Sequence, residues 1–319
     1  MIKLIWRTDV HFSDHTPKRR NGNWTDDVAK KLEWIGAYTQ DHKIDAVIDG
    51  GDFFDVKTPS RNSHGLVSRT AKIHKEYACP IYTLVGNHDV KYGNIDYLEE
   101  QPLAVLFNAG VFEQFGGSKE VVFEKDGLRV RLVGIPYHGT SYDWELIRSI
   151  KKGDEDYLLV ACHLLASEKG GVGAMFEGED IVPYDELTGR GVDGWFFGHW
   201  HKDQGVVQWG DTTVVNVGSL TRGSLHLDDL DRKPYMVVVS IDKEGIEFLK
   251  VDVPCREDAF KVEEAIIEKN NKKRMEEIVE KMKKVATEDK GLSLIDRVNA
   301  IVGIDQKVKE IAISYLEKI

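Results

Sequence analysis

The chain carries aspartate, asparagine and histidine side chains in five short motifs, each at the end of an apolar run. These motifs are Thr8-Asp9-Val10-His11, Asp49-Gly50-Gly51-Asp52, Gly86-Asn87-His88-Asp89, the run Leu158–His163, and Gly198-His199-Trp200-His201. Carboxylate oxygens, amide oxygens and imidazole nitrogens together make the mixed ligand set of divalent metal sites. Two such cations, roughly 3.5–4 Å apart, clamp the attacking and leaving oxygens of a phosphate ester. The spacing therefore predicts a two-metal site that cleaves phosphate esters.

Seven residues are the candidate metal ligands: Asp9, His11, Asp52, Asn87, His163, His199 and His201. Asp9 and His11 flank one residue, so both side chains can point to the same side of an emerging strand. A carboxylate at Asp52 can give one oxygen to each cation. We expect two divalent ions here, with a shared water that loses a proton near neutral pH and attacks phosphorus in line. The ligand types do not identify the metal, because such sites accept manganese, iron, zinc or cobalt.

A leaving alkoxide also needs a proton or electrostatic stabilisation. His88 follows the candidate ligand Asn87 in the turn Gly86-Asn87-His88-Asp89, and we assign it as general acid or stabiliser. Asp89 is expected to hold the other ring nitrogen of His88 and keep the ring cationic. Taken alone, a single histidine in such a place is more often a hydrogen-bonded core residue, so the prediction rests on the whole set of motifs in order.

Strands and helices alternate in the first part of the chain. Strands are expected at 2–7, 46–48 and 81–85, with helices at 23–42 and 60–77, and Thr25 is the expected N-cap of the first helix. In such an α/β core, ligands bind beyond the carboxyl ends of the strands, where the first three motifs fall. The middle of the chain is richer in strands, with hairpins around Asp126-Gly127, Gly210-Asp211 and Lys243-Glu244-Gly245. We therefore expect two packed sheets with helices outside.

The composition changes after Pro254. Residues 256–319 contain no proline, and they carry 14 acidic and 14 basic residues, so the net charge of −11 lies in the preceding part. Apolar residues recur there at helical spacing. Examples are Met275, Val279, Met282 and Ala286, and then Val308, Ile311, Ala312, Tyr315 and Ile319. We predict a core domain at 1–254 and a helical module of about three helices at 255–319, broken near Gly291 and Gly303.

The bulk composition bounds the compartment and the partners. Three cysteines without framework spacing argue against disulfides, and the early charged residues exclude a signal peptide. No apolar run is long enough to span a membrane, so a cytoplasmic protein is expected. An acidic chain does not favour nucleic acid as a partner, although bound cations and one basic strip can offset the overall charge.

The five motifs together resemble those of the calcineurin-like metallophosphoesterase superfamily, over about residues 1–250. The resemblance implies a four-layer α/β/β/α sandwich followed here by a small all-helical C-terminal module. It implies one metal held by Asp9, His11, Asp52 and His201, and a second held by Asp52, Asn87, His163 and His199. It also gives His88 the role of the family's catalytic histidine.

Narrower features resemble the Mre11/SbcD branch of DNA nucleases. They are the segment Gly51-Asp52-Phe53-Phe54-Asp55, the long loop 12–24 after the first motif, and Asn216–Arg222 followed by Arg232-Lys233-Pro234-Tyr235. This similarity implies a manganese-dependent exonuclease or endonuclease of DNA repair or recombination. It also implies a homodimer that works with an ABC-type ATPase of the Rad50/SbcC kind through the C-terminal helices.

Basic side chains near the motifs are candidate contacts to DNA phosphates: Lys18, Arg19, Arg20, Arg61 and Arg222. The alternative is a solvated charge cluster. Trp24 and Trp200 could stack on bases or pack in the core.

Two departures from the nuclease branch keep other functions open. Asp55 stands where some members carry a second catalytic histidine, and only a short helical segment replaces the usual cap domain. A small-molecule phosphodiesterase or phosphatase on the same metal core is therefore the alternative, and a non-enzymatic scaffold is a third. The helical tail could bind the ATPase, pair across a dimer or pack on its own core.

Overall fold

The computed structural model describes residues 1–55, 61–168, 178–225, 231–288, 293–300, 303 and 305–316. They form two compact units, a core unit at Met1–Phe260 and a tail unit at Lys261–Ile319. The core unit thus ends shortly after Pro254, where the composition of the sequence changes.

The first sheet of the core unit has a parallel centre with an antiparallel hairpin on one side. Its order is β14-β13-β1-β2-β3-β4. β1 pairs in parallel with β2 and antiparallel with β13. The strands are β1 (Ile2–Arg7), β2 (Ala46–Asp49), β3 (Ile81–Thr83), β4 (Glu113–Gln114), β13 (Tyr235–Ile241) and β14 (Ile246–Asp252).

The second sheet repeats this plan, with parallel strands in the middle and a hairpin partner at each edge. Its order is β11-β12-β10-β7-β6-β5, and β10 pairs in parallel with both β7 and β12. The strands are β5 (Val121–Lys125), β6 (Leu128–Ile135), β7 (Tyr157–His163), β10 (Gly194–Gly198), β11 (Gly205–Trp209) and β12 (Thr212–Asn216). A separate short pair joins β8 (Ala166–Ser167) to β9 (Val182–Pro183).

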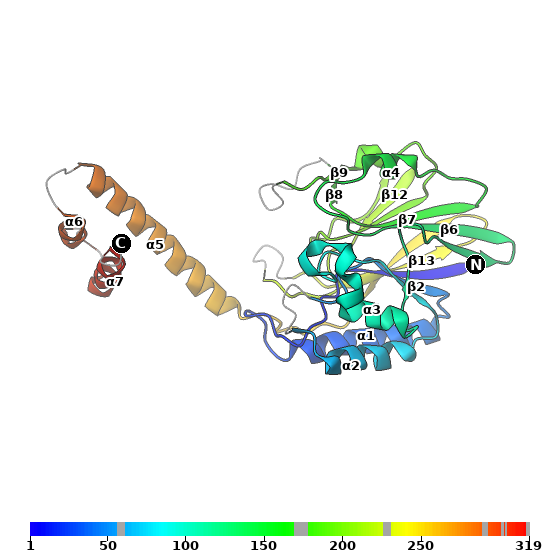
Figure 1. The fold of residues 1–319 in the computed structure, drawn as a ribbon, viewed down its shortest axis with the longest axis horizontal. Coiled ribbons are helices and arrows are strands. Elements are labelled where there is room, and N and C mark those ends of the chain that lie inside the picture. Colours follow the sequence, from blue (N-terminus) through cyan, green and yellow to red (C-terminus); the bar gives the residue numbers. More distant parts are fainter. Residues whose placement is uncertain are drawn as a thin grey trace. The chain divides into compact units, whose positions relative to one another are not determined.

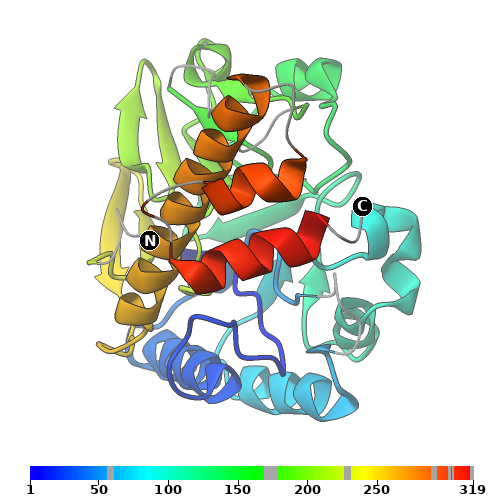
Figure 2. The ribbon, with the colours of Figure 1, turned by 90° about the vertical axis from the view of Figure 1, so that its left-hand side faces the viewer.

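The two sheets face each other, and helices cover their outer sides (Figure 1). Leu4, Trp6, Leu159 and Phe196 are buried between the sheets. Helices cover the first sheet and α4 lies over the second, with α1 and α2 side by side in both views (Figures 1 and 2). The helices are α1 (Trp24–Asp41), α2 (His64–Lys75), α3 (Pro102–Asn108) and α4 (Trp144–Ser149), with 3-10 turns at Lys91–Gly93, Ile95–Glu100 and Tyr184–Leu187. The structure confirms the predicted α/β/β/α sandwich.

The helix starts differ in detail from the sequence prediction. The N-cap of α1 is Asn23, whose side chain accepts a hydrogen bond from the backbone N–H of Asp26. Thr25, the predicted cap, instead donates its hydroxyl to the carbonyl of Ser13. Asparagine and threonine both cap helices, so two candidates this close cannot be separated from sequence. The second helix begins after Ser63, later than predicted; position 60 lies outside the described residues.

A buried ion pair joins the ends of β1 and β2. Arg7 Nε donates to Asp49 Oδ2 at 2.7 Å, and both side chains are fully buried. The same guanidinium donates to the Tyr77 hydroxyl at 3.0 Å and lies 3.1 Å from His74 Nε2. Breaking a buried pair of this kind leaves an uncompensated charge. The network therefore fixes the relative position of the two strands that lead into the first two motifs.

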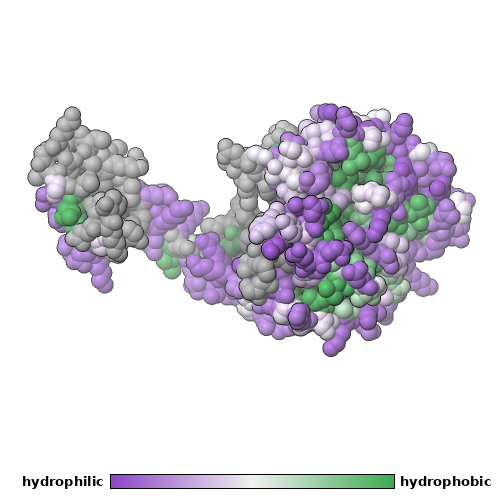
Figure 3. Space-filling view, in the orientation of Figure 1, coloured by the Kyte–Doolittle hydropathy of each residue, from purple (hydrophilic) through white to green (hydrophobic). Residues whose placement is uncertain are grey.

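The tail unit is helical, as the composition predicts. It contains α5 (Val262–Glu288), α6 (Leu294–Ala300) and α7 (Gln306–Leu316). Gly303 has φ +83°, consistent with the predicted break there, whereas position 291 lies outside the described residues. The side chains of both predicted apolar stripes also lie outside the described residues, except that of Val308. On the face seen in Figure 3 the described atoms of α5 are mostly hydrophilic. Among the described residues, no helix is both long and apolar enough to cross a membrane.

Candidate metal centre

The strand ends of both sheets bring the five motifs to one place. Arg7 is level with Asp49, and Asp49 with Thr83, in the parallel register of the first sheet. In the second sheet, Gly198 is level with His163. Because parallel strands end at the same edge, the residues that follow them meet there. The candidate ligands from both sheets therefore converge.

Four of the seven candidate ligands have a backbone conformation that L-residues rarely adopt. Their φ angles are +54° at Asp9, +47° at His11, +54° at Asp52 and +84° at His199. Strain of this kind persists only where the surroundings impose it, and it concentrates at functional sites. Glycine is required at position 86, next to these ligands. A Cβ atom there would lie 2.2 Å from Asp52 Oδ1, which is too close for any other residue.

Asp9, His11, Asp52 and His201 form the first group. One ligand atom from each lies within 4.8 Å of the others. The Nε2 atoms of His11 and His201 are 2.9 Å apart, and His201 Nε2 is 3.3 Å from Asp9 Oδ1. Two imidazole nitrogens facing each other beside two carboxylates are arranged as donors around a cation.

Asp52, His163 and His199 form the second group, again within 4.8 Å. His163 Nε2 lies 3.4 Å from Asp52 Oδ1 and 3.2 Å from Asn87 Oδ1. His163 Nδ1 lies 2.7 Å from the carbonyl oxygen of Gly50, which orients the ring with Nε2 toward the site. All seven candidate ligands thus lie in one cluster.

Asp52 belongs to both groups, and its environment fits a bridging carboxylate. Its Oδ1 accepts the backbone N–H of His88 at 2.7 Å, whereas its buried Oδ2 has no hydrogen-bond partner among the described residues. A buried carboxylate oxygen without a partner is costly unless a cation satisfies it. The donor set therefore fits two divalent cations; which residue binds which cation stays a prediction.

Electrostatics keep Asp9 and His11 in the forms that bind metals, whereas at His163 the charge and hydrogen bond of Asp52 outweigh burial and raise the pKa to about 9. Burial would raise the pKa of Asp9, but the hydrogen bond and charge of His201 lower it to about 2. Burial lowers the pKa of His11 to about 3, helped by repulsion from His201. Metal ligation needs ionised carboxylates and neutral imidazoles. Asp9 and His11 therefore need no change of protonation near neutral pH.

His88 lies beside the first group, but its partner is not the predicted one. Its Nδ1 is 3.2 Å from Asp55 Oδ1, and Arg61 donates to Asp55 Oδ2 at 2.9 Å. Asp89 is fully buried, and its two oxygens accept the backbone N–H groups of Phe54 and Gly86. The predicted contact between Asp89 and His88 is therefore wrong. Both oxygens of Asp89 bind backbone N–H groups of the turn, and Asp55 contacts His88 instead. Burial would raise the pKa of Asp55, but His88 and Arg61 lower it to about 2, so this carboxylate is ionised.

A groove of about 370 Å³ opens beside these histidines. Its lining includes His11, His88, His201, Asp55 and Arg232.

Of the predicted DNA contacts, Lys18, Arg61 and Arg222 line this groove. Arg20 is buried against Trp24 and lines a neighbouring pocket, while Arg19 lines neither of these two pockets. Trp24 is 2% exposed, so it packs in the core and does not offer a face to a base.

Glu179 is a site residue that the sequence did not reveal. Its Oε1 lies 2.9 Å from His199 Nε2 and accepts the Tyr142 hydroxyl at 2.9 Å. A carboxylate on a ring nitrogen of a ligating histidine fixes the ring and raises its basicity. Glu179 lies outside the strands and the motifs, and no spacing links it to His199.

Comparisons with known proteins agree with this geometry. The family model for calcineurin-like phosphoesterases matches residues 3–203. SbcD, a component of the nuclease SbcCD of Escherichia coli strain K12, is 28% identical over 97 residues, covering 30% of this chain and 23% of that protein. The uncharacterized metallophosphoesterase YhaO of Bacillus subtilis strain 168 is 25% identical over 240 residues, covering 72% of this chain and 54% of that protein. The matches thus span about a quarter and about half of these relatives. A dimetal phosphatase from Danio rerio has a similar fold, with a TM-score of 0.50 at 10% identity, over 79% of this chain and 99% of that one.

Proposed function

Because the chain belongs to the calcineurin-like phosphoesterase family, we propose that it hydrolyses phosphodiesters with two divalent cations, and that its substrate is DNA. The observation that carries the proposal is the pair of ligand groups that share Asp52. When bound, two divalent cations would supply Lewis acidity and lower the pKa of a water molecule in the site. Manganese is the proposed metal, on the resemblance to the Mre11/SbcD branch.

The protein's own residues have separate tasks in this proposal. Asp9, Asp52, Asn87 and the ligand histidines hold the cations, and Glu179 orients His199. His88 faces the groove and gives a proton, or positive charge, to the leaving oxygen. Asp55 contacts Nδ1 of His88 and orients the ring, and Arg61 holds Asp55 in place. Lys18, Arg61 and Arg222 lie along the groove, where backbone phosphates would pass.

DNA as the substrate is supported by two observations. One relative is named a nuclease, and its similarity covers a stretch of this chain. The groove beside the candidate metal centre carries Lys18, Arg61, Arg222 and Arg232 against Asp55. A locally basic groove suits phosphate contacts even though the chain as a whole is acidic.

The salt dependence of hydrolysis tests the substrate. We expect manganese-loaded protein to cleave single-stranded DNA with a rate constant kcat/KM that falls as salt rises, with a logarithmic slope of about −0.7 per phosphate contact. Three contacts would give a slope of about −2. Bis-p-nitrophenyl phosphate, a small diester, should show almost no slope and serves as the control in the same buffers. Cleavage of the small diester without any cleavage of DNA would remove DNA as the substrate.

A small-molecule phosphodiesterase or phosphatase is the second candidate function. The groove is about 370 Å³, which is within the size range of small-molecule sites. Cyclic nucleotides and nucleoside monophosphates, assayed beside the oligonucleotide with manganese, separate the two candidates. A kcat/KM higher for one of these molecules than for DNA would favour the second candidate.

We further propose that the tail unit binds a protein partner, an ABC-type ATPase of the Rad50/SbcC kind or a second copy of the chain. Ile266 and Ile267 of α5 are 44% and 60% exposed, which leaves apolar side chains for a partner. Removal of residues 261–319 should leave hydrolysis of the small diester within about twofold, because the candidate ligands all lie in the core unit. Light scattering and co-purification with such an ATPase should show loss of the dimer or of the complex. Assemblies that persist without the tail would refute this role.

A further inference from the structure

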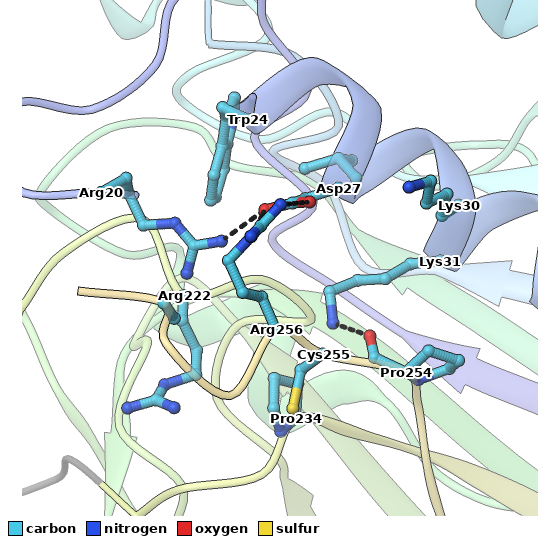
Figure 4. A pocket seen from close by; sticks show the side chains of 12 residues that line it. Arg20, Trp24, Asp27, Lys30, Lys31, Arg222, Pro234, Pro254, Cys255 and Arg256 are labelled. Carbon is cyan, nitrogen blue, oxygen red and sulfur yellow. Dashed lines mark hydrogen bonds and ion pairs between the residues drawn. The ribbon is translucent and has the colours of Figure 1, made fainter. Parts of the chain in front are cut away.

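A second pocket of about 320 Å³ lies next to the groove of the candidate metal centre. Five basic side chains line it, with one carboxylate, that of Asp27. The basic residues are Arg20, Lys30, Lys31, Arg222 and Arg256. Figure 4 shows that they come from three parts of the chain: the loop before α1 and α1 itself, the loop at Arg222, and the segment after Pro254.

The single carboxylate is already shared by two guanidinium groups. Asp27 Oδ2 accepts from Arg20 at 3.1 Å and from Arg256 Nε at 3.1 Å, and Arg256 also reaches Oδ1 at 3.3 Å. Figure 4 shows Asp27 between these two arginines, while the guanidinium of Arg222 turns away from it. With Asp258, which is not part of the lining and lies 3.4 Å from Arg256 Nη1, two carboxylates offset five basic side chains, so the pocket keeps a positive potential.

Two of these cations are buried without a full set of hydrogen-bond partners. Arg20 is 6% exposed, and its Nε has no acceptor among the described residues. Lys31 is also 6% exposed, and the only acceptor recorded for its ammonium group among the described residues is the neutral carbonyl of Pro254. Burial lowers the pKa of Lys31 to about 8, although the nearby Cys255 and Asp27 oppose this, and Arg20 lowers it further. Buried cations normally have a counter-charge; Arg20 shares that of Asp27 with Arg256, and Lys31 contacts only a neutral carbonyl in the described part of the chain, so this arrangement suits an anion from outside the chain.

The pocket adjoins the groove, because two side chains line both cavities. Trp24 and Arg222 line both cavities. Trp24 also donates its indole N–H to the carbonyl oxygen of His11, a candidate metal ligand, at 3.2 Å. Trp24 and Arg222 therefore lie between an anion in the pocket and an ester at the metal centre. A chain with a phosphate at every unit can occupy both places at once.

We propose that this pocket binds a backbone phosphate of the same nucleic-acid strand whose scissile phosphate lies at the metal centre. The inference rests on the proposed function, and it narrows the substrate from phosphodiesters in general to strands of several nucleotides. Arg20, Lys31 and Arg256 form this second phosphate site, and Arg222 marks the path between the two. Contacts of this type carry no sequence preference and fix the position of the strand.

Charge-removing variants of similar length test the site: Arg256→Gln and Lys31→Met. For each variant, kcat/KM on a single-stranded 12-nucleotide DNA should fall about tenfold, because a charge-assisted hydrogen bond to phosphate is lost. The salt slope should become shallower by about 0.7. Hydrolysis of bis-p-nitrophenyl phosphate should stay within about twofold, because that molecule is too small to reach the second pocket. Arg148→Gln, which removes an exposed arginine paired with Glu186 elsewhere in the core unit, is the matched control.

A binding measurement separates this inference from the proposed function. Fluorescence anisotropy of the labelled oligonucleotide, with the metals chelated, should show weaker binding for both variants and unchanged binding for the control. If the wild-type protein hydrolyses neither substrate but the variants still bind DNA less well, the proposed function fails and the phosphate site stands. Unchanged binding and turnover of DNA in both variants, with thermal melting showing intact folding, would overturn the site. Competition by polyglutamate as strong as that by DNA would also overturn it, in favour of an acidic protein partner.

Discussion

Replacement of Asp52 by alanine should abolish hydrolysis of every phosphodiester and release the metals. Asp52 is the only residue common to both ligand groups among the described residues, and its buried Oδ2 accepts no hydrogen bond from them. Without it each cation loses an anionic donor, and the histidines of both groups lose the charge that offsets them. Loss of several kcal/mol of transition-state stabilisation lowers kcat on the order of a thousandfold or more.

Metal content and turnover should be measured together. Elemental analysis after manganese loading and gel filtration should find about two ions per wild-type chain and fewer than one in Asp52→Ala. Asp154→Ala removes an aspartate whose side chain is 84% exposed and should leave both values unchanged. A variant that keeps two ions and wild-type turnover would show that the cluster around Asp52 is not the catalytic centre.

The sandwich could be predicted from the sequence because its signals are local. Alternation of apolar strands with amphipathic segments gave β1, β2 and β3 close to their observed bounds. Short elements such as α3 and the 3-10 turns at Lys91–Gly93 and Tyr184–Leu187 were not anticipated. They are set by packing on the finished sandwich, and their sequences carry too few residues for a periodic pattern.

The sequence predicts only those residues of the candidate site whose positions are determined by the ends of strands. Asp9, Asp52, Asn87, His163 and His199 follow strands or end them, so the topology alone brings them together. The partner of His88 depends instead on where two loops turn. Asp89 is adjacent in sequence but points inward to backbone N–H groups, whereas Asp55 reaches His88 from another motif. Glu179 and the second phosphate site depend on contacts between loops, which no periodicity records.

Replacement of His88 by alanine should keep the metals but remove most of the turnover. His88 lies in the groove beside His11, with ring centroids 4.7 Å apart, and its ring nitrogen contacts Asp55, not the ligand carboxylates. A positioned general acid or stabiliser is worth about a hundredfold to ten-thousandfold in rate, so kcat should fall by that factor while two ions remain bound. Asp55→Asn should cause a smaller loss, because it removes the negative charge beside His88 Nδ1 but keeps a side-chain oxygen that can orient the ring. His42→Ala, at the exposed end of α1, is the control for loss of a histidine. Wild-type hydrolysis by His88→Ala would mean that proton donation to the leaving oxygen comes from elsewhere, and loss of the ions would make His88 a metal ligand.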